Sequence, residues 1–206
     1  MIVVPGPAST SLGEEIAKLL SAKVVGVEHK TFPDGESYIR LTDSVRGEKV
    51  VVVQSTGPDQ NKNLMELFLL VDTAYRLGAD SVIAVVPYLA YSRQHKEYRP
   101  GEAISAITMA KLLKSLGADG FVTVNVHDES ILGEFPNPVN VSAITQLASH
   151  FVEEGMAGAF ALAPDDGAVD IAKEADSVLR GGYGWLEKTR DVITGEVSVE
   201  EKSNES

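Results

Sequence analysis

A long polar segment carries most of the side chains that could bind an anionic ligand. Residues 87–105, PYLAYSRQHKEYRPGEAIS, join an apolar run at 81–86 to a predicted helix. Strand-to-helix connections in α/β proteins usually take roughly 2–6 residues, so this one is unusually long. It contains the polar residues Arg93, Gln94, His95, Lys96 and Arg99 and the aromatic residues Tyr88, Tyr91 and Tyr98. Guanidinium groups bind phosphate oxygens and tyrosine rings offer flat faces, which predicts a nucleoside triphosphate site.

A second candidate for ligand binding is the segment TFPDGE at 31–36. Phe32 offers a ring on which a base can stack, and the carboxylates of Asp34 and Glu36 can accept hydrogen bonds from an exocyclic amine. The alternative is a Pro-Asp-Gly turn that only joins two strands.

Two further positions suit a metal ion that accompanies a nucleotide. His127 follows the apolar run 122–124 at a predicted strand end, although a histidine there is often structural. Asp165 and Asp166 precede Gly167, where one aspartate could simply cap a helix. Carboxylates are preferred ligands of Mg²⁺, which keeps several waters and bridges substrate phosphates.

The last candidates are two cations near the C-terminal end of the sequence. Lys188 and Arg190 are separated by one residue and follow a predicted strand end at 185–187. Their charges could stabilise a phosphoryl group in transfer, or could simply be solvated.

Alternating apolar and amphipathic runs predict the elements that position these residues. Strand-like runs at 2–4, 50–54 and 81–86 alternate with helical patterns, one of which ends at Gly78. The segments RLGADSVIAVVPY (76–88) and SLGADGFVTVNVH (115–127) share one plan, although Leu-Gly-Ala-Asp is also a common helix stop. Two such units predict neighbouring parallel strands whose polar ends lie along one sheet edge. The fold class expected is α/β, with a mainly parallel sheet flanked by helices.

The second half of the sequence predicts a smaller unit of the same kind. Prolines at 136 and 138 interrupt the pattern, after which a helix at 142–153 and a strand at 158–162 are expected. We place two tandem domains at 1–140 and 141–206, the second incomplete, with an exposed edge or apolar face. The polar tail from 198 is expected to be frayed.

Composition excludes several classes of protein. The 206 residues include no cysteine, which excludes thiol nucleophiles and thiolate metal sites, and the net charge of −12 disfavours nucleic acid and anionic membranes as partners. No apolar run approaches a membrane span of about 18 residues, and no signal peptide is visible, so we expect a cytoplasmic protein. Walker, Rossmann, zincin and α/β-hydrolase motifs do not occur.

Taken in order, these segments resemble one family closely, the ribose-phosphate pyrophosphokinases. The resemblance covers residues 1 to about 199 and is archaeal in type, because His95 follows Arg-Gln where other branches have aspartate. It is carried by FPDGE (32–36), STGPDQNKNLMEL (55–67), PYLAYSRQHK (87–96), EAISA (102–106), NVHDESILGEF (125–135), APDDGAV (163–169) and EKTR (187–190).

The resemblance implies an activity and a role for each candidate residue. The activity is transfer of diphosphate from Mg·ATP to ribose 5-phosphate, giving 5-phosphoribosyl 1-diphosphate and AMP, by a homo-oligomer of phosphoribosyltransferase-like domains. Lys188 and Arg190 would lie on a flexible catalytic loop, and His127 and Asp165 would bind Mg²⁺. The residues implied to hold ATP are Phe32, Asp34 and Glu36, contributed by a neighbouring subunit, together with Arg93, Gln94, His95 and Arg99.

One departure from the family pattern bears on the sugar substrate. The family's Asp-Asp…Thr-Gly-Gly-Thr loop, which cradles the 5-phosphate of ribose 5-phosphate, does not occur in these residues. We therefore expect ATP binding to persist, ribose 5-phosphate binding to be weak and turnover to be slow or absent. The alternatives are a non-catalytic regulatory or assembly subunit of a full-length enzyme and a plain phosphoribosyltransferase.

Overall fold

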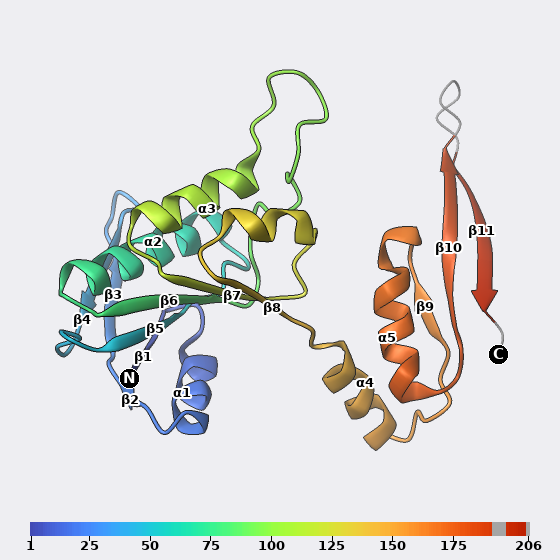
Figure 1. Ribbon diagram of the computed structural model, residues 1–206, viewed down its shortest axis with the longest axis horizontal. Helices are drawn as coiled ribbons and strands as arrows, with labels where there is room; N and C mark the ends of the chain where they lie inside the picture. The colour runs from blue at the N-terminus through green and yellow to red at the C-terminus, as the bar shows by residue number, and fades with distance from the viewer. Residues whose placement is uncertain (191–196, 205–206) are drawn as a thin grey trace. The chain divides into compact units, whose positions relative to one another are not determined.

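The computed structural model describes residues 1–190 and 197–204, without the side chains of 188–190, 197–201 and 204. Contacts divide the chain into two compact units, Met1–Val141 and Ser142–Ser206, and each has its own sheet and core cluster. Figure 1 shows the elements of both units.

The first unit is built on a sheet of parallel strands in the order β2-β1-β5-β6-β7-β8. These strands are β1 (Ile2–Pro5), β2 (Lys23–Val24), β5 (Lys49–Val53), β6 (Ser81–Val86), β7 (Gly120–Val124) and β8 (Pro138–Val141). In β5, Val50 and Val52 pack into the larger core cluster, while Val51 and Val53 pack into a separate cluster on the other face. Burial on both faces explains why the strand is a continuous β-branched run.

Three helices cover the two faces of this sheet. Figure 1 shows α2 (Gln60–Arg76) and α3 (Ser105–Ser115) on one face and α1 (Thr10–Leu19) on the other. A 3-10 helix, η1 (Glu129–Glu134), contributes the buried Ile131 to the larger core cluster. The predicted α/β class, with a parallel sheet and flanking helices, is confirmed.

The two Leu-Gly-Ala-Asp segments end helices and also lead into neighbouring strands. Gly78 and Gly117 adopt φ of 88° and 93° directly after α2 and α3, and β6 pairs with β7 in parallel. A Cβ atom at Gly117 would lie 2.4 Å from the ring of Tyr75, so only glycine fits there. The same Leu-Gly-Ala-Asp sequence therefore ends a helix and leads into a strand at both places.

The segment 31–36 connects two antiparallel strands, β3 (Val27–Thr31) and β4 (Ser37–Leu41). The amide of Gly35 donates to the carbonyl of Phe32 at 2.9 Å, and Gly35 has φ of 93°. The hairpin turn suggested by Pro-Asp-Gly is thus present, and it presents Phe32, Asp34 and Glu36 at its tip.

The prolines at 136 and 138 do not end the first unit. Pro138 begins β8, which pairs with β7 from Phe121↔Pro138 to Val124↔Val141. A proline is tolerated there because β8 is an outer strand of the sheet.

The second unit contains a three-stranded sheet in the order β11-β10-β9. Its elements are α4 (Ile144–Glu153), β9 (Ala161–Ala163), the 3-10 helix η2 (Asp166–Ala168), α5 (Val169–Leu179), β10 (Tyr183–Arg190) and β11 (Val197–Asn204). The expectation of a frayed tail from 198 is wrong, because β11 pairs antiparallel with the whole of β10. Valines at 197 and 199 alternate with polar residues, a period that suits a strand.

Apolar side chains are exposed on the second unit. Its buried cluster consists of Leu179 and four alanines. A groove of about 260 Å³ is lined by apolar residues, among them Leu147, Phe151 and Ile171, which are 55%, 46% and 44% exposed. Among the described residues, no helix is long and apolar enough to cross a membrane.

Candidate functional site

The carboxyl ends of β6 and β7 border a pocket of about 300 Å³ in the first unit. One side of its lining comes from the connection 87–104, including Tyr88, Tyr91 and Arg93, and the other from 124–127, which includes His127. The structure thus brings together two segments that the sequence places more than thirty positions apart. Carboxyl ends of neighbouring parallel strands are where ligands bind in open α/β sheets.

Thr56 anchors the start of the connection 87–104 to the sheet. Its hydroxyl donates to the carbonyl of Tyr88 and accepts from the amide of Ala90, each at 2.7 Å. Leu89 and Ala90 are buried in the larger core cluster. The connection therefore leaves the sheet from a fixed point.

His95 ties the middle of the connection to the segment after β7. Its Nε2 atom lies 3.1 Å from Oδ2 of Asp128, and its Nδ1 atom lies 3.2 Å from the carbonyl oxygen of Arg93. Both partners are hydrogen-bond acceptors, and a ring N–H of His95 can donate to either of them. The rings of His95 and His127 lie 6.0 Å apart between centroids. His95 is thus positioned by Asp128, a residue for which the sequence suggested no role of its own.

Hydrogen bonds hold the carboxylate of Asp128 in its charged form. Side-chain and backbone hydrogen bonds from Ser130 lower the pKa of Asp128 from its usual 3.8, and the charges of His95 and His127 lower it further. The amide of Ser130 donates to Oδ1 of Asp128 at 2.9 Å, which also caps η1.

The predicted phosphate-binding cations lie on the outer part of the connection. Arg93 and Arg99 are exposed, and within the described residues neither guanidinium forms an ion pair. Gln94 is half-buried, and its backbone carbonyl accepts a hydrogen bond from the amide of Ala106 in the first turn of α3. Guanidinium groups without a protein partner retain their capacity to bind phosphate oxygens.

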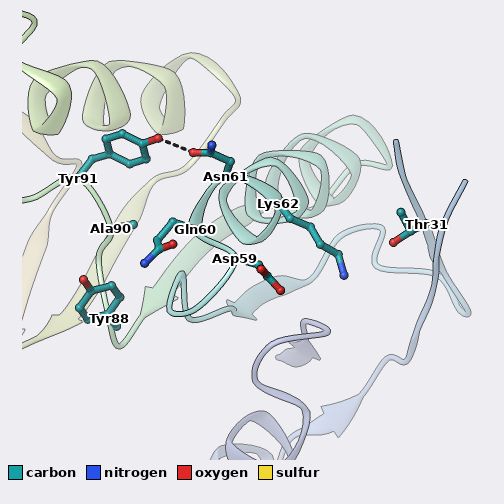
Figure 2. A pocket seen from close by; sticks show the side chains of 8 residues that line it. All are labelled: Thr31, Asp59, Gln60, Asn61, Lys62, Tyr88, Ala90 and Tyr91. Carbon is teal, nitrogen blue, oxygen red and sulfur yellow. Dashed lines mark hydrogen bonds between the residues drawn. The ribbon is translucent and has the colours of Figure 1, made fainter. Parts of the chain in front are cut away.

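A second, larger pocket of about 730 Å³ adjoins the first, since Tyr88 and Tyr91 line both. Figure 2 shows Tyr91 hydrogen-bonded to Asn61 on one side, and Lys62 extending from α2 toward Thr31 on the other. Thr31 belongs to the hairpin, so this pocket lies between the hairpin and the connection 87–104. Its tyrosine rings and polar groups suit a planar ligand with hydrogen-bonding edges.

The tip of the hairpin stands in solvent. Phe32 is 38% exposed, its ring meets Tyr38 edge-on, and the ammonium of Lys30 lies 4.6 Å from its centroid. Asp34 accepts from the amide of Glu36 at 3.2 Å. In the part of the chain that the structure describes, none of Phe32, Asp34 and Glu36 lines the pocket at β6 and β7.

The two predicted metal ligands belong to different units. His127 is exposed in the first unit, and Asp165 is half-buried in the second. Asp165 stands at the N-cap position of η2 but makes no capping hydrogen bond, so capping does not explain its carboxylate. A Cβ atom at Gly167 would lie 3.3 Å from its Oδ1 atom, so glycine keeps space beside that oxygen.

The carboxylate of Asp165 fits Mg²⁺ as an ion that arrives with a nucleotide. Carboxylate oxygens are hard ligands, and few protein ligands are needed because Mg²⁺ keeps waters and substrate phosphates. In the described residues, no group of three or more acidic or histidine side chains could hold a metal ion alone.

The backbone at Lys188 and Arg190 differs from the expected flexible loop. Both lie in β10, which continues past the predicted strand end at 187 and pairs with β11, so the backbone there is strand and not loop. Their side chains lie outside the described residues. Their catalytic role stays a prediction.

Comparison with known proteins matches the chain to one family over its whole length. Residues 1–117 match the model of the N-terminal domain of ribose phosphate pyrophosphokinase. The ribose-phosphate pyrophosphokinase of Saccharolobus solfataricus is 41% identical over 99% of this chain and 70% of its own length. That of Methanobrevibacter smithii is 40% identical over 100% of this chain and 70% of its own length.

A solved structure agrees with these relatives. The phosphoribosylpyrophosphate synthetase of Mycobacterium smegmatis superposes with a TM-score of 0.83 at 32% identity, covering 97% of this chain and 66% of that one. The chain thus spans about two thirds of the length of the proteins it matches. The resemblance drawn from its motifs is confirmed, and the chain belongs to the ribose-phosphate pyrophosphokinase family.

Proposed function

We propose that this chain binds Mg·ATP at the carboxyl ends of β6 and β7 and takes part in diphosphate transfer to ribose 5-phosphate. The observation that carries the proposal is the pocket there, which is lined by both Arg93 and His127. The contact between His95 and Asp128 ties together the two segments that contain these residues. Membership of the family supports the reaction type.

In this proposal the triphosphate lies against Arg93 and Arg99, whose guanidinium donors suit anionic oxygens, and Gln94 contacts the nucleotide beside them. His95 stays near the nucleotide but is held by Asp128. Transfer of this kind needs positioning and charge neutralisation more than covalent catalysis. Mg²⁺, when bound, supplies positive charge to the phosphates, and His127 and Asp165 are the residues that would hold it.

The adenine site is proposed to be shared between two copies of the chain. Phe32, Asp34 and Glu36 of one subunit would hold the base of a nucleotide bound by Arg93 of another. None of these residues, all within the described part of the chain, lines the pocket at β6 and β7 of its own unit, which supports this arrangement. The functional form would accordingly be a homo-oligomer.

The sugar side of the reaction is expected to be weaker in the residues described. Lys188 and Arg190 would neutralise the phosphoryl group in transfer, but no 5-phosphate loop of the family pattern occurs in this sequence. Isothermal titration with Mg·ATP and with ribose 5-phosphate separately tests this division. Tight binding of ribose 5-phosphate would contradict it.

Formation of AMP is the direct test of the activity. AMP that appears only when both Mg·ATP and ribose 5-phosphate are present supports a catalytic chain. Binding of Mg·ATP without AMP formation favours the alternative of a non-catalytic regulatory or assembly subunit.

The assignment of Arg93 can be tested by the variant Arg93→Ala. Loss of charge-assisted hydrogen bonds to phosphate is expected to weaken Mg·ATP binding by about tenfold to hundredfold. Arg76→Ala is a matched control, because Arg76 ends α2 and pairs only weakly with Asp72 at 3.8 Å. Equal affinities for Arg93→Ala and the unaltered chain would reject the site.

A further inference from the structure

Glu102 accepts more hydrogen bonds than its exposed position in the connection 87–104 would suggest. Its Oε2 atom accepts from Nε2 of Gln94 at 3.3 Å and from the amides of Tyr98 and Arg99, each at 3.0 Å. The amide of Glu102 in turn donates to the carbonyl of Arg99 at 3.1 Å. One carboxylate thus closes the outer part of the connection on itself.

The donors to Glu102 include two residues that are proposed to contact ATP. Gln94 is held through its side chain, and Arg99 is held through its backbone. Gln94 also donates to the carbonyl of Lys96 at 3.2 Å, so its amide group is fixed between two acceptors. Without Glu102, the amides of Tyr98 and Arg99 lose this acceptor, and the outer part of the connection loses its cross-link.

We propose that Glu102 is a positioning residue for nucleotide binding, which orders the connection so that Arg99 faces the phosphates in advance. The role rests on the proposed function of the pocket. Binding is tighter when a loop is already in its bound conformation, because less conformational entropy is lost on association.

The sign of the effect separates positioning from simple electrostatics. Glu102 carries a negative charge in a connection proposed to bind a polyanion. If charge alone mattered, removing it would reduce repulsion and tighten Mg·ATP binding. If Glu102 orders the connection, removing it weakens binding despite the lost repulsion.

The first experiment compares Mg·ATP affinities of the full chain and its variants by titration calorimetry. Glu102→Ala is expected to weaken binding about threefold to tenfold, the range for one or two lost hydrogen bonds. Glu102→Gln keeps an acceptor oxygen and is expected to recover most of the affinity. Glu97→Gln is the control, because it removes a like charge from the same connection while keeping an acceptor for the amide of Gly101.

The result expected for Glu97→Gln is unchanged or slightly tighter binding. Affinity of Glu102→Ala equal to or above that of the unaltered chain would overturn the proposal. So would an equal loss of affinity in Glu97→Gln and Glu102→Ala, since the effect would then not be specific to Glu102.

A second experiment needs no nucleotide. Trypsin can cleave after Arg93 and Lys96 in this connection, whereas Pro100 protects the bond after Arg99. Glu102→Ala is expected to be cleaved about threefold to tenfold faster at these sites, with an unchanged midpoint of global unfolding. Equal cleavage rates would overturn the ordering role. Failure of the unaltered chain to bind Mg·ATP would reject the proposed function, and the cleavage rates would still decide the role of Glu102.

Discussion

The six-stranded sheet and the connection 87–104 above it are held by different forces. Strands β1 and β5 bury valines on both faces, where several have no exposed surface. In the connection beyond Ala90, Tyr91 and Tyr98 are 44% and 58% exposed, and order comes from polar contacts such as that between His95 and Asp128. Apolar burial contributes most of the folding free energy, whereas exposed polar contacts contribute little. The sheet should therefore determine stability, and the connection should determine binding.

The largest expected effect comes from comparing the loss of one aromatic side chain in the sheet with the loss of one in the connection. Phe121 in β7 is fully buried and stacks on Phe135 at 4.0 Å between centroids. Phe121→Ala is expected to lower the free energy of unfolding by about 3–5 kcal/mol, because a cavity remains. Tyr98→Ala, in the connection, should lower it by about 0.5 kcal/mol or less. Urea unfolding measures both losses of free energy. Similar losses would contradict the view that the sheet, and not the connection, determines stability.

The next effect concerns the junction between sheet and connection. Thr56 has no exposed surface, and its hydroxyl serves both Tyr88 and Ala90. Thr56→Val keeps the shape but leaves the buried amide of Ala90 without its acceptor. We expect a loss of about 1–3 kcal/mol in unfolding free energy. Thermal unfolding would show it, and a neutral result would mean that the connection is not anchored through this hydroxyl.

The same substitution in the middle of the sheet should have the opposite sign. Thr123 in β7 is fully buried, and its hydroxyl is the one buried side-chain group in the described residues without a hydrogen-bond partner. Thr123→Val removes this unsatisfied group and is expected to stabilise the fold by up to about 1 kcal/mol. A clear loss of stability, measured alongside Thr56→Val, would show that the hydroxyl has a partner in solution.

The smallest effect depends on pH. Folding lowers the pKa of Asp128, so its ionised form is favoured in the folded state. The stabilisation is complete above the usual 3.8 and is lost as the pH falls through the lowered pKa. Asp128→Asn should therefore be less stable than the unaltered chain near neutral pH and equal to it in strong acid. The difference is expected to be about 0.5 kcal/mol or less, because Asp128 is partly exposed and solvent screens its charge.

Urea unfolding of the two chains across the acid range tests this dependence. Ser130→Ala is the companion variant, since the side chain of Ser130 is the largest cause of the lowered pKa. In that variant, the loss of stability should begin at a higher pH. A difference in stability between Asp128→Asn and the unaltered chain that stayed constant down to strong acid would contradict the expected direction of the pKa shift.

The sheet was predictable from the sequence because strands buried on both faces are continuous apolar runs. The run at 81–86 coincides with β6, and Gly78 adopts the positive φ expected of it. Strand β11 was not predictable in this way, since it is polar and depends on pairing with β10. Pro138 does not interrupt β8, because the edge of a sheet tolerates a residue that its interior excludes.

The site was predictable as a set of residue types but not as a set of contacts. Tyrosines and cations in a long connection indicated a ligand, and the structure places several of them around two pockets. The contact between His95 and Asp128 joins residues far apart in sequence, so spacing provided no sign of it. Glu102 was missed because an exposed glutamate usually only solubilises a surface. A glutamate following Pro-Gly at the end of a long connection was the available signal.

The outer strands of the six-stranded sheet also decide how this unit can meet other chains. At one margin β2 has only two residues, and at the other β8 begins with Pro138, which has no amide hydrogen to donate. Short strands and prolines are poor templates for an additional strand from another molecule. Both margins of the six-stranded sheet are thus poorly suited to pairing with a strand of another molecule.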